Sequence, residues 1–95
     1  MERLIISIVV MAALALPAQA ECYLDYKAKQ DDPLRLHYGV AQISDAVCDN
    51  KKAARAEMEP RLAVDGWTLI KIMGFFGPDG LNERKASAGD YFLRY

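Results

Sequence analysis

The first twenty residues constrain this chain most, because they have the pattern of an export signal and not of a folded domain. Residues 4–16 are apolar apart from Ser7, Pro17 ends the run, and Ala18 and Ala20 fit a small-residue cleavage site. A membrane span needs roughly 20 apolar residues, and this run is thirteen. We therefore expect cleavage after Ala20, a mature protein with no stable membrane insertion, and a periplasmic or secreted location.

The mature chain, residues 21–95, is expected to be one small domain. Its 75 residues lie near the lower limit at which one hydrophobic core suffices. It keeps eleven Lys/Arg and twelve Asp/Glu residues, so its net charge is close to zero. The basic residues are paired at most, as in Lys51-Lys52, and form no cluster of the kind that a nucleic-acid backbone requires. The composition therefore does not support a nucleic-acid partner.

Both cysteines, Cys22 and Cys48, lie in the exported part. An even cysteine count in a small secreted chain predicts a disulfide, and two cysteines allow one pairing. Closing a loop of about 27 residues would stabilise the fold by roughly 3.5 kcal/mol. No Cys-x-x-Cys motif favours a redox-active site instead.

The pattern of apolar residues predicts a strand hairpin at the start of the mature chain. Residues 22–29 and 34–43 both alternate between apolar and polar side chains, and residues 30–33, Gln-Asp-Asp-Pro, favour a turn. His37, the only histidine, falls on the polar side of the second strand and is expected to be exposed or to cap a neighbouring group.

A helix is predicted within residues 46–65, with Ser44 and Asp45 or Asp49 and Asn50 as alternative N-caps. Pro60 predicts a kink or a second short helix, and Gly66 suits the left-handed C-cap.

Residues 67–76 are apolar on both faces and predict a central strand. Two sets of side chains are expected to point to opposite sides: Trp67, Leu69, Met73 and Phe75 on one, and Ile70, Ile72 and Phe76 on the other. Residues 81–89 predict a polar loop, and 91–95 a last strand. The expected fold class is α+β: a four-stranded, mainly antiparallel sheet of order 2-1-3-4, with one helix on one face (β-β-α-β-β).

No catalytic, cofactor or metal motif stands out. His37 lacks the ligand spacing of a metal site, and no Gly-x-Ser-x-Gly surrounds a serine. One enzymatic alternative is a small hydrolase that uses His37 with a carboxylate such as Asp25 across the hairpin. We expect no cofactor and no metal.

The second face of the sheet is the remaining candidate for function. An exposed apolar face usually marks an interface, and we expect Trp67, Phe75, Phe76 and Tyr91 to line it. The alternative is that residues 77–89, or lysine and arginine stems, cover this face. The leading hypothesis is therefore a non-enzymatic module that binds a protein, a ligand or a second copy of itself. A structural subunit of an envelope assembly is a further possibility.

The run Asp65-Gly66-Trp67-Thr68-Leu69-Ile70 follows the expected helix and opens the apolar strand. It resembles a type of small uncharacterised exported bacterial α+β domain. In that type a helix closes with Gly-Trp-x-Leu and feeds a strand pair with an aromatic-basic-aromatic-like tail, here Leu93-Arg94-Tyr95. The resemblance covers residues 50–95, and Cys22, Cys48 and the leading hairpin depart from it. It implies a small α+β domain and carries over no activity.

Overall fold

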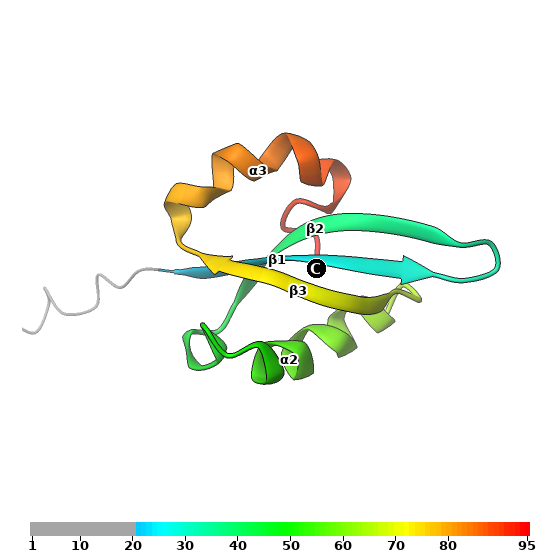
Figure 1. The fold of residues 1–95 in the computed structure, drawn as a ribbon, viewed down its shortest axis with the longest axis horizontal. Helices are drawn as coiled ribbons and strands as arrows, with labels where there is room; N and C mark the ends of the chain where they lie inside the picture. Colours follow the sequence, from blue (N-terminus) through cyan, green and yellow to red (C-terminus); the bar gives the residue numbers. More distant parts are fainter. Residues whose placement is uncertain (1–20) are drawn as a thin grey trace, which may run out of the picture.

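The computed structural model describes residues 21–95, and the expected export signal lies outside the described residues. The fold is α+β, as predicted. Its antiparallel sheet has the order β2-β1-β3, and helices α2 and α3 lie on opposite sides of it (Figure 1). The elements are β1 (Cys22–Gln30), β2 (Arg35–Ile43), α2 (Lys51–Ala63), β3 (Thr68–Phe76) and α3 (Leu81–Ala88), with 3-10 turns at Asp45–Val47, Pro78–Gly80 and Gly89–Tyr91. No helix within residues 21–95 is long and apolar enough to cross a membrane.

The predicted hairpin is confirmed. Strands β1 and β2 pair in one continuous antiparallel register from Cys22 opposite Ile43 to Gln30 opposite Arg35. Strand β3 pairs with the other side of β1, also antiparallel. The first three positions of the predicted strand order, 2-1-3, are therefore correct.

Helix α2 begins and ends with the expected local chemistry. The Asn50 side chain accepts a hydrogen bond from the Ala53 amide at its start. Gly66 has a φ of 78° at its end, and the next amide, that of Trp67, donates to the Leu62 carbonyl, which is a Schellman closure. The helix continues through Pro60, so the predicted alternative of a second short helix is wrong.

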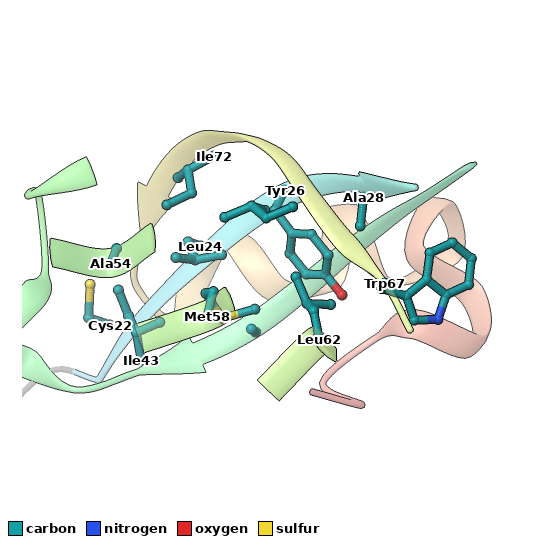
Figure 2. Packing of buried hydrophobic residues seen from close by; sticks show 12 residues of the cluster. Cys22, Leu24, Tyr26, Ala28, Ile43, Ala54, Met58, Leu62, Trp67 and Ile72 are labelled. Carbon is teal, nitrogen blue, oxygen red and sulfur yellow. The ribbon is translucent and has the colours of Figure 1, made fainter. Parts of the chain in front are cut away.

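The hydrophobic core lies between the sheet and α2 (Figure 2). Leu24 and Tyr26 of β1 face Met58 and Leu62 of α2, and all four are fully buried. Burying one such side chain contributes about 1.5–3 kcal/mol, so this layer holds the helix against the sheet.

Two predictions for the C-terminal third are wrong. Residues 81–88 form helix α3 and not a loop, and residues 91–95 do not form a fourth strand. Leu81, Arg84 and Ala88 recur at helical spacing toward the sheet, although Ala88 alone is buried. After α3 the chain reaches the far side of β2, where Phe92 makes an isolated parallel bridge with Val40.

The predicted alternation in β3 is also wrong, because the strand contains two irregularities. Its register against β1 shifts between Asp25 and Tyr26 and again between Lys27 and Ala28. Each shift inserts an extra residue and changes which side chain turns inward. Leu69 and Ile72 are therefore both buried, and Ile70 and Met73 are each 42% exposed.

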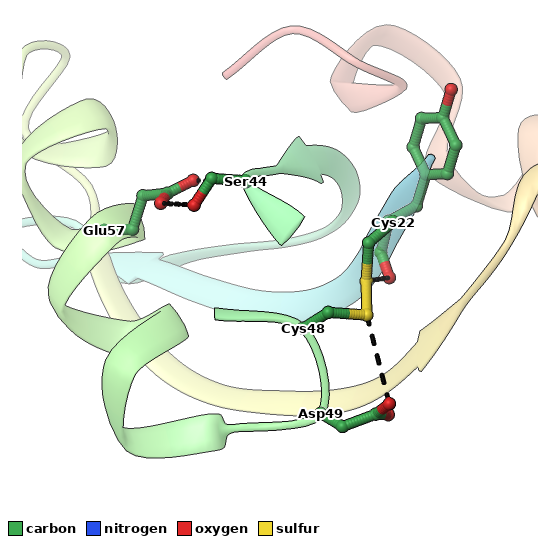
Figure 3. Close-up of a disulfide and its surroundings, with 6 residues drawn as sticks. Cys22, Ser44, Cys48, Asp49 and Glu57 are labelled. Carbon is green, nitrogen blue, oxygen red and sulfur yellow. Dashed lines mark hydrogen bonds between the residues drawn. A yellow bond between two sulfur atoms is a disulfide. The ribbon is translucent and has the colours of Figure 1, made fainter. Parts of the chain in front are cut away.

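The predicted Cys22–Cys48 disulfide is present (Figure 3). It ties the start of β1 to the segment that leads into α2, with 6.1 Å between the two Cα atoms. Nearby, Ser44 donates a 2.6 Å hydrogen bond to Glu57 of α2, and this contact lowers the pKa of Glu57. The disulfide suits an oxidising, extracytoplasmic setting.

Candidate functional site

His37 is buried, so the prediction of an exposed or capping histidine is wrong. It lies opposite Ala28 of β1 and turns toward the same face as α2, where 7% of its surface remains exposed. The leucines before it, Leu34 and Leu36, are the exposed ones, at 65% each. Alternation separated the two sides of β2 correctly, but both sides are partly buried, with His37 on one and Val40 on the other.

An aromatic cage surrounds His37. The Tyr26 hydroxyl is hydrogen-bonded to Nε2 at 2.9 Å, the Tyr91 ring stacks on the imidazole at 3.7 Å, and Trp67 approaches edge-on at 4.2 Å. Burial lowers the pKa of His37 to about 4, with a further contribution from the charge of Arg94. His37 is therefore a neutral structural group at pH 7.

Asp25 belongs to a separate cluster on the opposite face of the sheet. Its carboxylate accepts a 2.9 Å hydrogen bond from Tyr38 and a 3.3 Å ion-paired contact from Arg84 of α3. The guanidinium of Arg84 also lies 4.0 Å from the centre of the Phe76 ring. Burial and the bond to Asp25 raise the pKa of Tyr38 to about 12. This cluster docks α3 on the sheet.

The proposed pairing of His37 with Asp25 is consequently wrong. The two side chains point to opposite faces, and each is engaged by other groups. Within residues 21–95, no group of three or more His, Cys, Asp or Glu side chains could hold a metal ion.

The four residues expected at an interface separate into two places. Trp67 is 6% exposed and belongs to the core, and Tyr91 is stacked on His37. Trp67 therefore presents no free surface, and Tyr91 is half-buried. Phe75 and Phe76 are partly buried at the end of β3 and line a pocket there.

The outer edge of β2 is covered at Val40 and Gln42. The Leu93 amide of the C-terminal tail donates to the Val40 carbonyl at 2.8 Å, and Arg61 of α2 donates to the Gln42 carbonyl at 2.7 Å. Covering an edge in this way blocks pairing with another chain.

The outer edge of β3 is covered over a short stretch. Arg55 of α2 donates to the carbonyls of Leu69 and Ile70, at 3.4 and 2.9 Å. From Lys71 to Phe76, no strand from residues 21–95 pairs with this edge. Six residues of strand are about 20 Å long, enough to pair with an extended segment.

Two pockets of opposite charge flank the open part of the β3 edge. The basic pocket, about 290 Å³, is lined by Lys51, Arg55, Lys71 and Ile72. The acidic pocket, about 450 Å³, lies beside the disulfide and is lined by Glu21, Asp45 and Asp49 together with Phe75, Phe76 and Gly77. Apart from the phenylalanines, none of these residues was predicted to line a functional site. The four-residue spacings of Lys51 with Arg55 and Asp45 with Asp49 were visible, but their relation to an open edge was not.

No family model matches this chain, and no curated protein or solved structure matches it either.

Proposed function

We propose that this protein is a small exported module, periplasmic or secreted, that acts without catalysis by binding a protein segment along the outer edge of β3. The observation that carries the proposal is the difference between the two edges of the sheet. On the edge of β2, the C-terminal tail binds at Val40 and Arg61 binds the Gln42 carbonyl, whereas six residues of β3 have no pairing partner among residues 21–95. An exposed edge strand is a template for an added strand.

The side chains along this edge support binding by more than backbone hydrogen bonds. Ile70 and Met73 are both apolar and 42% exposed, and Phe75 and Phe76 line the adjacent pocket. An added strand obtains affinity from the main chain and specificity from such side-chain contacts. Two of the four interface residues predicted from sequence, Phe75 and Phe76, remain in this proposal.

Photo-crosslinking in the native envelope fraction tests the proposal. A photoreactive amino acid replaces Met73 on the edge or, as the matched control, Val64, which is apolar, 83% exposed and located after α2. We expect crosslinked protein from position 73 and little from position 64. A Met73→Lys variant should abolish capture at the edge, and the control Val64→Lys should not. Equal crosslinking at the two positions would refute an edge-binding function.

A further inference from the structure

We propose that the partner at the β3 edge is a second copy of this chain, paired antiparallel about a two-fold axis near Met73. This inference rests on the proposed edge-binding function and names its partner. It follows from the order of charges along the strand.

The charges change sign along β3. The basic pocket lies beside Lys71 and Ile72, near the middle of the strand, and the acidic pocket lies beside Phe75, Phe76 and Gly77 at its end. Lys51 and Arg55 of α2 supply the other cations, and Glu21, Asp45 and Asp49 supply the acids. The open edge is therefore positively charged near the middle of β3 and negatively charged near its end.

In an antiparallel two-fold arrangement, the positive part of one edge lies beside the negative part of the other. An axis at Met73 places Lys71 of one protomer opposite Phe75 of its partner, and so places each basic pocket beside an acidic one. The same register puts Ile70 opposite Phe76 and brings the two exposed Met73 side chains together. Opposite charges and apolar pairs directly across strands are both favourable.

The alternative arrangements are disfavoured by the same charges. A parallel pairing of the two edges would place like-charged pockets together. Repulsion between like charges across the interface disfavours this arrangement. An isologous contact also closes on itself, because both protomers use the same edge. The expected product is a discrete dimer with a six-stranded sheet.

The test uses charge reversal on the protein of residues 21–95. Lys71→Glu makes the basic side repel the acidic pocket of its partner, and Asp45→Lys makes the acidic side repel the basic pocket. Each contact occurs twice in a two-fold dimer. Surface pairs contribute up to about 1 kcal/mol each, so each variant should weaken self-association by roughly 10-fold or more, measured by sedimentation at low ionic strength.

Mixing the two variants is the decisive arm. In a heterodimer of Lys71→Glu with Asp45→Lys, one contact pairs the two reversed residues and the other pairs the unmodified Lys71 and Asp45. Both contacts are attractive, so the mixture should recover dimerisation as one-to-one heterodimers by native mass spectrometry. The controls are Lys52→Glu and Asp90→Lys, which make the same charge changes at exposed positions outside both pockets. They should dimerise as the unmodified protein does.

Two results would overturn the inference: an unmodified protein that stays monomeric at high concentration, or a mixture that fails to recover. A monomeric protein that still crosslinks to a different polypeptide through position 73 would refute the second copy and leave the proposed function standing. Loss of both self-association and crosslinking at position 73 would refute both.

Discussion

The buried His37 makes the stability of this domain depend on pH between about 6.5 and 4. In the folded protein its pKa falls from the ordinary value of 6.5 to about 4, because the cage excludes water from the imidazole. Unfolding exposes the ring, which then takes up a proton below pH 6.5. The unfolded state therefore binds more protons in this range, and stability falls as the pH falls.

The magnitude follows from the shift. One pKa unit corresponds to about 1.4 kcal/mol, so the free energy of unfolding should decrease by about 3 kcal/mol between pH 7 and pH 4. The contribution is complete above pH 6.5, and His37 causes no further loss once the pH is below 4. For a domain of this size, 3 kcal/mol is a large part of the total stability.

Urea unfolding followed by Trp67 fluorescence measures this decrease directly. Trp67 is the only tryptophan, and its ring lies 4.2 Å from that of His37. The control is the double variant Tyr26→Phe/His37→Phe, which replaces both partners of the buried hydrogen bond and so leaves no orphaned polar group. Carboxylates titrate in both proteins, so the difference between the two slopes isolates His37. Equal slopes from pH 7 to pH 4 would refute the reasoning.

Two further predictions concern stability. Replacing Cys22 and Cys48 by alanine should lower the free energy of unfolding by about 3.5 kcal/mol, because the bridge closes a sequence separation of 26 residues. A loss below about 1 kcal/mol in a urea titration would contradict the loop-closure argument. Gly39→Ala should cost about 1–3 kcal/mol by overpacking, since a Cβ there would lie 2.5 Å from the Tyr26 ring. Gly74→Ala, whose nearest neighbour would be Asp25 at 3.8 Å, should be close to neutral in thermal unfolding, and equal effects at the two glycines would refute the steric explanation.

The elements that were predicted correctly are those whose signals lie close together in the sequence. The β1–β2 hairpin follows from two alternating runs and a turn, and the closure of α2 follows from Gly66 alone. Helix α3 was not predicted, because the side that faces the sheet contains Arg84, a charged residue, where an apolar one would be expected. Arg84 faces the sheet because it forms an ion pair with Asp25 of β1.

The candidate site was harder to predict because it depends on pairing between distant segments. Alternation in β2 shows two sides but not which one α2 covers, so His37 was placed on the wrong side. The insertions in β3 moved Ile72 inward and Met73 outward, and no local signal marks them. The open edge exists because the tail lies beside β2 and not beside β3.

The His37 cage and the open β3 edge are linked through the C-terminal tail. Tyr91 and Tyr95 stack near His37 at one end of the sheet, and Tyr95 also donates to the Asp65 carboxylate. These contacts hold the tail where the Leu93 amide can close the edge of β2 at Val40. Covering part of the β2 edge in this way hinders the addition of another strand there. The cage therefore does more than fill the core: by fixing the tail, it covers the β2 edge at Val40 and leaves β3 as the edge that we propose for strand pairing.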